Sequence, residues 1–308
     1  MNYLLTLLIL VLSVPAPVSA EAQENVLLAD PFIMLHDGTY YAYGTHSEWG
    51  IEVYTSENLE EWNRHDRLAL DRKDSWGEQY FWAPEVYDMD GKFHMYYCAN
   101  EHICAAVSDS PLGPFVQTAA RPMVEGEKTL DPSMFVDEDG RAYLFFVRMN
   151  GGTAVWMAEM TENRLDIRPE TMQRCLTVTE AWEKVWPEVM NGPYVFRRGD
   201  TYYMLFYANS HESRNCGVGY ATAPGIWGPW TKSASNPILQ KPGPLVGTGQ
   251  CSLFTDKEGE LRIAFHSHYD TMHVDPRKMH IGRVRFRKMP WSSLSLLIDG
   301  SYITPIRK

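Results

Sequence analysis

Short runs of alternating apolar and polar residues, many rich in Tyr and Phe, dominate this chain. Five of these runs follow a turn signal of the same kind, in which glycine adjoins an acidic residue: Asp37-Gly38, Asp90-Gly91, Asp139-Gly140, Gly199-Asp200 and Glu258-Gly259. Glycine supplies the positive φ of a tight turn, so each signal predicts an antiparallel hairpin. The turn glycines recur about every 50 to 60 residues, which is the period of a propeller blade.

A second pattern repeats behind the hairpins. Residues 51–62, 105–115 and 218–230 each read as a strand, a small polar turn and a closing aromatic residue, which is Trp62, Phe115 or Trp230. Residues 156–160 and 281–286 fit as the matching strands of the other two units. Each unit therefore offers three or four short strands, and no amphipathic helix longer than about three turns is evident.

We predict an all-β fold, a five-bladed β-propeller in a single domain. A stacked array of β-sandwiches is the alternative. A ring is favoured because it leaves only short, protected sheet edges.

The N-terminus reads as a targeting segment. Residues 4–11 are apolar, and Val18-Ser19-Ala20 has the small residues of a cleavage site. The apolar run is too short to span a bilayer. We therefore expect a signal peptide over residues 1–20, a propeller domain over 21–308 and export to the periplasm or the medium. A buried N-terminal helix is the alternative.

Composition and charge disfavour some classes of binding partner. The chain has a net charge of −11, and Phe, Trp and Tyr make up 13% of it. Because no long Lys/Arg cluster occurs, we expect no nucleic-acid partner. We also expect no membrane association after signal cleavage, and a monomer. The five cysteines fit no zinc pattern; Cys98 and Cys104 could bridge a hairpin, but unpaired buried thiols are favoured.

The first strand of each unit should line the axis of the propeller. Residues six to nine positions before each turn glycine should therefore meet at one mouth: Ala29-Asp30-Pro31, Ala83-Pro84-Glu85, Leu130-Asp131-Pro132, Asn191-Gly192-Pro193 and Gly249-Gln250-Cys251. Carboxylates held close together repel, so one retains its proton while another stays ionised. That division suits the acid–base hydrolysis of glycosides. Taken singly, each Asp-Pro also suits the start of a strand.

Other residues fit a sugar site. Trp82 lies beside the second axial segment, and flat aromatic rings can stack on sugar faces. Three more tryptophans fall in expected loops: Trp49, Trp76 and Trp186. His266, His268 and Arg277 form a polar group in the last unit. Core packing for the tryptophans and a surface ladder for the polar group are the alternatives.

These motifs together resemble glycoside hydrolase family 43, the arabinanases, α-L-arabinofuranosidases and β-xylosidases. The resemblance runs from about residue 25 to 286 and includes ADPFIMLHDGTYYAYGT, FWAPEVYDMDGKFHMYY, SDSPLGPF and LDPSMFVDEDGRAYLFF. It continues through NGPYVF, YYMLFYA, GVGYATAPGIWGPW and GTGQCS. The family is a five-bladed propeller of inverting glycosidases. The resemblance implies that Asp30 is the general base, and that Asp131 tunes the pKa of the acid and orients it.

Two positions depart from the family pattern. Asn191 stands where the family has its general-acid Glu, and Gln250 stands where a His helps to hold a central metal or water. Another carboxylate could serve as the acid: Glu188, Glu85 or Glu183. Three strand residues span about 10 Å, so Glu188 would need a bulge or loop to reach the axis. Alternatively the site binds sugar without efficient turnover, or the Asn191-Gly192 pair deamidates to an acid.

We therefore expect an inverting glycoside hydrolase that cleaves arabinofuranosyl, xylosyl or related linkages of oligo- and polysaccharides. Asp30, Asp131 and Glu188 are the predicted catalytic residues. The predicted substrate-binding residues are Trp82, Glu85, Asn191, Gln250, His268 and Arg277. No cofactor is required, and a structural calcium is the one ion considered. An impaired carbohydrate-binding propeller and a protein-interaction propeller are the alternatives.

Overall fold

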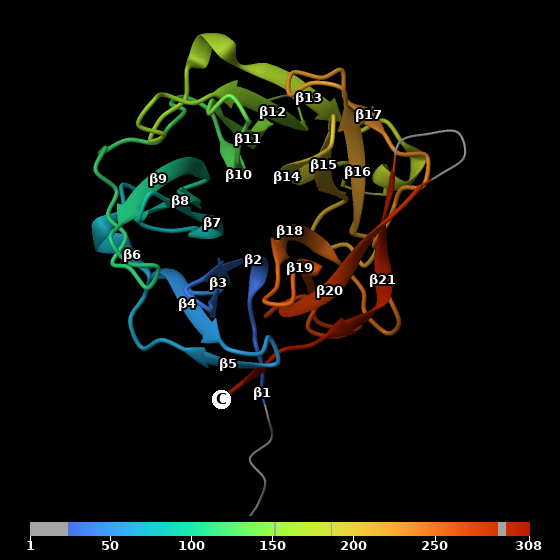
Figure 1. Cartoon of the computed structure of the whole chain (residues 1–308), viewed down its shortest axis with the longest axis horizontal. Helices are drawn as coiled ribbons and strands as arrows, with labels where there is room; N and C mark the ends of the chain where they lie inside the picture. Colours follow the sequence, from blue (N-terminus) through green and yellow to red (C-terminus); the bar gives the residue numbers. More distant parts are fainter. Residues whose placement is uncertain (1–23, 151, 186, 289–293) are drawn as a thin grey trace, which may run out of the picture.

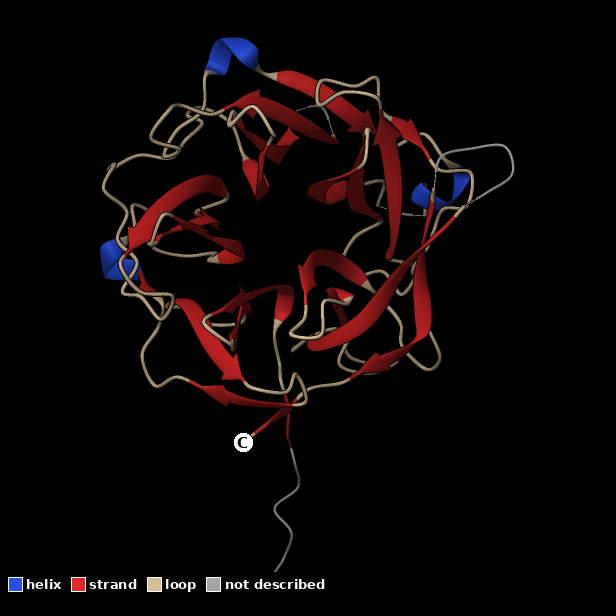
Figure 2. Ribbon diagram, viewed as in Figure 1, coloured by secondary structure: helices blue, strands red, loops and turns tan. Residues whose placement is uncertain are grey.

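The computed structural model describes residues 24–150, 152–185, 187–288 and 294–308. The predicted signal peptide, the start of the expected mature chain and Trp186 lie outside these residues. The fold is built from strands arranged around a common centre (Figure 1). Three short 3₁₀ helices are described: η1 (Arg72–Asp74), η2 (Pro169–Thr171) and η3 (Ala181–Glu183). The fold is therefore an all-β propeller, as the repeat predicted (Figure 2).

The first sheet contains both ends of the described chain. Its strands, in spatial order, are β1 (Glu24–Asn25), β22 (Ile306–Arg307), β5 (Glu61–Arg64), β4 (Gly50–Ser56), β3 (Thr39–Thr45) and β2 (Ala29–His36), with β6 (Leu70–Asp71) paired to β4. Strand β22 pairs antiparallel with β1 and parallel with β5. This pairing closes the ring because it joins the end of the chain to its beginning.

Four further sheets follow in chain order. The second has three strands, β7 (Trp82–Met89), β8 (Lys92–Ala99) and β9 (His102–Ser108). The third comprises β10 (Thr129–Val136), β11 (Ala142–Met149), β12 (Thr153–Glu159) and β13 (Gln173–Thr177). The fourth comprises β14 (Met190–Arg198), β15 (Thr201–Ala208), β16 (Gly217–Ala223) and β17 (Thr231–Lys232). The fifth comprises β18 (Gly249–Thr255), β19 (Leu261–Ser267), β20 (Lys278–Arg287) and β21 (Ser295–Ile303).

The five predicted hairpins are present. They join β2 to β3, β7 to β8, β10 to β11, β14 to β15 and β18 to β19. All five turn glycines have positive φ, between 59° and 82°. Each hairpin begins with the strand nearest the centre (Figure 1), as the sequence pattern required.

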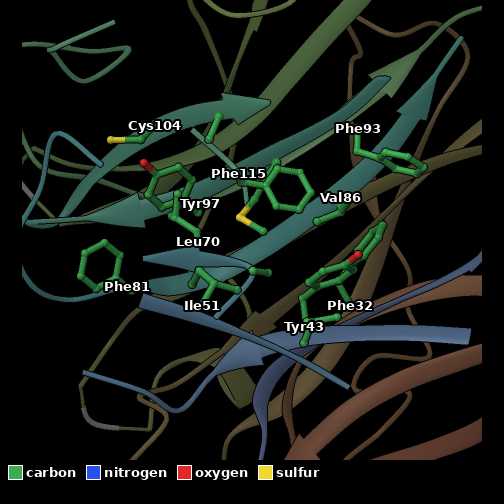
Figure 3. Close-up of a cluster of buried hydrophobic side chains, with 14 of the residues drawn as sticks. Phe32, Tyr43, Ile51, Leu70, Phe81, Val86, Phe93, Tyr97, Cys104 and Phe115 are labelled. Atoms are coloured by element: carbon green, nitrogen blue, oxygen red, sulfur yellow. The ribbon is translucent and has the colours of Figure 1, made fainter. Parts of the chain in front are cut away.

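Hydrophobic side chains fill the space between consecutive sheets. One cluster joins the first and second sheets and includes Phe32, Tyr43, Val86, Phe93 and Phe115 (Figure 3). Equivalent clusters join each later pair. A fifth cluster packs the last sheet against the first. A linear array of β-sandwiches would leave the outer faces of its end sheets uncovered, so this closure excludes that alternative.

The cysteines follow the favoured expectation, because all five are free and four are buried. Cys98 lies opposite Ile103 in the β8–β9 ladder, whereas Cys104 lies opposite Tyr97. The two side chains therefore point to opposite faces of the sheet, since neighbouring strand positions alternate. Cys98 packs toward the third sheet and Cys104 toward the first.

Candidate active site

A backbone irregularity marks the same position in the first strand of every sheet. The hairpin register shifts at five equivalent places, which hold Asp30, Ala83, Asp131, Gly192 and Gln250. The first four of these residues have left-handed φ values of 45° to 60°. Such conformations are strained for residues other than glycine and concentrate at functional sites. The bulges bring residues of neighbouring sheets together, as where Asp131 Oδ2 meets the Gly192 N–H.

The structure corrects one of the five axial segments. In the second sheet, Ala83 occupies the position of Asp30, and Glu85 lies two residues further along the strand. Glu85 therefore belongs to a deeper layer, level with Phe32, Ser133, Tyr194 and Cys251. Pro84 is equivalent to Pro31, Pro132 and Pro193, so the residue before it, Ala83, is the equivalent of Asp30, and grouping Glu85 with the mouth residues placed it two positions off. Its predicted contact with substrate has no support in this placement.

Asp30 is a buried carboxylate with three polar partners. Its Oδ2 accepts a hydrogen bond of 2.6 Å from the Thr45 hydroxyl, and its Oδ1 lies 3.2 Å from an Arg277 guanidinium nitrogen. Burial alone would raise the pKa of this carboxyl. The charge of Arg277 and the contacts with His266 and Thr45 outweigh burial and hold the pKa well below its usual range. Asp30 is therefore ionised, as a general base must be.

His266 completes the surroundings of Asp30. Its Nδ1 accepts the Asp30 backbone N–H at 3.0 Å, and the ring is fully buried. Burial, together with the charge of Arg277, lowers the pKa of His266 to about 4, so the imidazole is neutral at neutral pH. A Cβ at position 249 would lie 2.6 Å from its Nε2, which explains the glycine there.

Asp131 differs from Asp30 in its protonation. Its Oδ2 accepts the Gly192 backbone N–H at 3.0 Å, and its own N–H donates to Cys98 Sγ at 3.2 Å. Burial and the nearby negative charge of Asp30 raise the pKa of Asp131 to about 7. The two aspartates therefore titrate in very different pH ranges, although they occupy equivalent strand positions.

The two amide positions lie beside this pair of aspartates. The Asn191 Nδ2 donates to the Tyr207 hydroxyl at 3.1 Å. Among the described residues, the buried Asn191 Oδ1 and Gln250 Oε1 have no hydrogen-bond partner. A Cβ at Gly192 would lie 2.6 Å from the Tyr207 ring and 3.2 Å from Gln250. The fourth and fifth sheets thus bring a hydroxyl and two amides together.

The alternative acids have different surroundings. Glu183 is fully buried, forms a 2.6 Å ion pair with Lys232 and accepts the N–H groups of Thr179 and Glu180. These contacts make it a structural residue and remove it as a candidate acid. The Glu85 carboxyl accepts a hydrogen bond from the Tyr87 hydroxyl, and burial raises the pKa of Glu85 to about 8.

Glu188 is the remaining candidate acid from the sequence. It is exposed in the segment between η3 and β14, three residues before Asn191. No described contact holds its carboxyl group away from the mouth. Its catalytic role stays a prediction.

The other residues predicted to bind the sugar differ in their surroundings. Arg277 contacts Asp30 directly, as described above. His268 is buried, and its Nε2 lies 2.7 Å from the His211 carbonyl oxygen, so its contact with substrate stays a prediction. Trp82 is half-buried beside the exposed Tyr80, with ring centroids 4.9 Å apart. Trp76 packs against the core cluster between the first two sheets instead of facing the mouth.

The residues around Asp30 are poorly suited to bind calcium. Calcium prefers six to eight oxygen ligands, several of them carboxylates. The described part of the chain contains no group of three or more His, Cys, Asp or Glu residues suited to a metal. The guanidinium of Arg277 already lies against Asp30 and would repel a cation. The residues present do not fit the ion.

Sequence reasoning missed Thr45 and Tyr207. Thr45 lies opposite Ala29 in the β2–β3 ladder and Tyr207 lies opposite Asn191 in the β14–β15 ladder. Counting outward from the turn glycines would have placed them one position away, opposite Asp30 and Gly192, because the count takes no account of the bulges. His266 was noted, but its contact with Asp30 depends on closure of the ring, because the two residues are 236 positions apart.

A propeller centre that holds two buried carboxyls with widely separated pKa values is suited to the acid–base chemistry of a glycosidase. The family model of the glycosyl hydrolases family 43 matches residues 24–292. The chain therefore belongs to this family and is a glycoside hydrolase.

Characterised relatives and solved structures agree with this assignment. The chain is 23% identical over 286 residues to a β-D-galactofuranosidase of Aspergillus niger, covering 84% of this chain and 80% of that protein. It is 24% identical to a xylosidase/arabinosidase of Humicola insolens, covering 59% and 75%. An endo-1,4-β-xylanase structure from Bacteroides thetaiotaomicron is 36% identical, with a TM-score of 0.88 over 93% of this chain and 99% of that one. A thermostable family-43 glycoside hydrolase is 31% identical, with a TM-score of 0.81 over 90% and 94%.

Proposed function

We propose that this protein is an exported, inverting glycoside hydrolase that cleaves arabinofuranosyl, xylosyl or related linkages of oligo- and polysaccharides. The substrate class rests on relatives named for xylosidase and arabinofuranosidase activities. Each of the five sheets is one blade of the propeller, and the protein acts as a monomer without a required cofactor. Export agrees with two relatives named as extracellular. In the described part of the chain, every helix is too short and too polar to cross a bilayer.

The observation that carries the proposal is the ionised Asp30 beside a second aspartate that retains its proton near neutral pH. Asp30 takes a proton from water, and the oxygen of that water forms the new bond to the anomeric carbon. Asp131 holds the Gly192 N–H and orients the acid. Glu188 gives its proton to the leaving oxygen as the glycosidic bond breaks. An inverting site places base and acid about 6.5–9.5 Å apart to admit the water.

Leaving-group dependence tests the assignment of the acid. We expect Asp30→Ala to lose activity on every substrate. Glu188→Gln should slow hydrolysis of xylo- and arabino-oligosaccharides by about 10²–10⁴-fold, the usual contribution of one acid or base. The same variant should retain most activity on dinitrophenyl glycosides, whose leaving group needs no proton. Equal losses on both substrates would remove Glu188 as the acid, and activity that survives in Asp30→Ala would remove Asp30 as the base.

Product stereochemistry tests the mechanism separately. NMR of the first-formed sugar should show the inverted anomer. A retained configuration would contradict inversion.

A non-catalytic carbohydrate-binding propeller is the second candidate, and Asn191 favours it. An amide cannot donate a proton as a carboxylic acid does, and its Nδ2 is already bonded to Tyr207. Calorimetry with oligosaccharides would then show binding without product release. Asn191→Glu tests this directly, because a large gain in turnover would identify a weakened enzyme.

The mass of the protein should be measured before these assays. It shows whether Asn191 remains an amide. The Gly192 nitrogen, which would have to attack the Asn191 side chain during deamidation, donates its hydrogen to Asp131 in this structure. We therefore expect the amide to be retained.

A further inference from the structure

Hydrogen bonds between neighbouring sheets repeat around the axis of the propeller. In four of the five sheets, the backbone N–H of the residue at the bulge donates to a side chain of the preceding sheet. From donor to acceptor, these bonds of 2.9 to 3.2 Å join Asp30 to His266, Ala83 to Thr45, Asp131 to Cys98 and Gly192 to Asp131. We call them the axial hydrogen bonds.

Three of the four acceptors occupy equivalent places. Thr45, Cys98 and His266 each lie on the second strand of a sheet, opposite the residue that precedes the bulge. They offer a hydroxyl, a thiol and an imidazole, yet each accepts the N–H of the next sheet around the ring. A shared structural task therefore accounts for a polar atom at this position in three sheets.

The third sheet departs from this pattern. Its equivalent position is Val147, opposite Leu130, and a valine side chain has no atom that accepts a hydrogen bond. The Asp131 carboxylate accepts the Gly192 N–H in its place. Asp131 is therefore held at two points, by Cys98 at its backbone and by Gly192 at its carboxyl group.

The backbone of Asp131 depends on such support. Its φ of 52° lies in the left-handed region, which a residue other than glycine retains only where its surroundings fix it. Cys98 is fully buried, so loss of its sulfur would leave the Asp131 N–H without a partner. Relaxation of this backbone would carry the carboxyl group away from the Gly192 N–H.

We infer that Cys98 is a positioning residue of the hydrolytic site, because its sulfur fixes the Asp131 carboxyl group through the Asp131 N–H. This inference rests on the proposed function, in which Asp131 orients the acid. Cys98 acts through Asp131 and does not touch the substrate. It is the counterpart of His266, which holds the Asp30 N–H.

Three substitutions at position 98 test the role of the sulfur in turnover. Cys98→Ala and Cys98→Val remove the acceptor, and Val also fills the space. Both should lower kcat on xylo- and arabino-oligosaccharides by about tenfold or more with little change in KM, because small displacements of catalytic groups are costly. Cys98→Ser should keep most of the activity, since a hydroxyl also accepts an N–H. The parent kcat in the Ala and Val variants, or a Ser variant as slow as these two, would overturn the inference.

Cys104 provides the matched control. It is a second fully buried thiol of the same sheet, but it packs toward the first sheet (Figure 3). Cys104→Ala should lower the melting temperature about as much as Cys98→Ala and leave kcat unchanged. An equal loss of kcat in both variants would show a merely structural effect and overturn the inference.

The titration of Asp131 gives a readout that does not depend on activity. Burial and Asp30 raise the pKa of Asp131 to about 7, and the Gly192 N–H opposes them because it stabilises the carboxylate. NMR of the aspartate carboxyl carbons, assigned with Asp131→Asn, should therefore show a higher pKa for Asp131 in Cys98→Ala. Cys98→Ser and Cys104→Ala should keep the parent value. All these variants retain the other ionisable groups around Asp131, which are Asp30, Glu85, Tyr207 and Arg277.

The two readouts separate this inference from the proposed function. If the parent protein hydrolyses no glycoside but the pKa of Asp131 rises in Cys98→Ala, the proposed function fails and the positioning of Asp131 by Cys98 stands. If the parent is active but Cys98→Ala changes neither kcat nor the pKa of Asp131, the positioning fails and the proposed function stands.

Discussion

At the scale of single residues, the two axial aspartates show how surroundings divide one chemical group into two roles. Both are buried and have left-handed backbones at equivalent positions. Arg277 stabilises the charge on Asp30, and that charge in turn raises the pKa of Asp131. Burial raises the pKa of both carboxyls, and the main group that offsets it at Asp30 is the Arg277 guanidinium, supplied by the loop before β20.

Removing that guanidinium should change the pH dependence of catalysis. In Arg277→Met, the largest of the effects that offset burial is lost, so the pKa of Asp30 rises. The base must be ionised, and the acidic limb of kcat/KM should move to higher pH by about one to three units. The pH profile on an aryl glycoside measures this. Arg277→Lys keeps the charge and should give a smaller shift; an acidic limb that stays in place in Arg277→Met would contradict the argument.

Glu85 should make the protein less stable as pH rises. Its pKa is 4.5 ordinarily and about 8 in the folded protein, because the carboxyl is buried. Between these values the folded state binds a proton that the unfolded state has lost, so the free energy of unfolding falls as pH increases. Glu85→Gln cannot titrate and should flatten this decline. Denaturant unfolding at pH 5 and pH 8 measures it, and an equally steep decline in both proteins would refute this origin.

At the scale of elements, bulges and turns position the site. Five turn glycines shape the hairpins, and five bulges mark equivalent positions in the inner strands. The short strand β22 lies between β1 and β5 and thereby closes the first sheet. The Ile306 N–H donates to the Glu60 carbonyl at 2.9 Å.

Breaking that closure should destabilise the whole ring. Ile306→Pro removes the donor and places proline inside a paired strand. We expect the melting temperature to fall by at least about 2–4 °C, the change that one kcal/mol produces in a chain of this size. Ile306→Val keeps the donor and serves as the control. Equal melting temperatures for the two variants would show that β22 contributes little to closure.

At the scale of the whole molecule, ring closure brings together residues that are distant in the chain. The fifth sheet packs against the first, and this contact places His266 and Arg277 around Asp30. The site thus depends on the complete ring, since no single sheet holds Asp30 together with its partners.

Export of the whole protein gives a separate prediction. The apolar segment and the small residues Val18-Ser19-Ala20 predict cleavage before about Glu21. Mass spectrometry of protein recovered from the periplasm or medium should find a mature chain that begins there. Intact residues 1–20 on protein that stays in the cytoplasm would contradict export.

The sequence by itself determined the hairpins, the order of the units and the identity of the axial aspartates. It could do so because turn glycines and strand alternation are local signals, and repeating them five times makes them specific. It also predicts, through the family resemblance, that Asn191 and Gln250 depart from the family pattern.

Only the tertiary structure decided the depth of Glu85, the structural role of Glu183 and the partners of Asp30. A bulge changes which side chains face the axis, and no turn count records it. The ion pair of Glu183 with Lys232 and the contact of Arg277 with Asp30 both join distant positions. The charge of Asp30, the proposed base, is therefore a property of the closed ring, because the groups that maintain this charge meet only when the last sheet packs on the first.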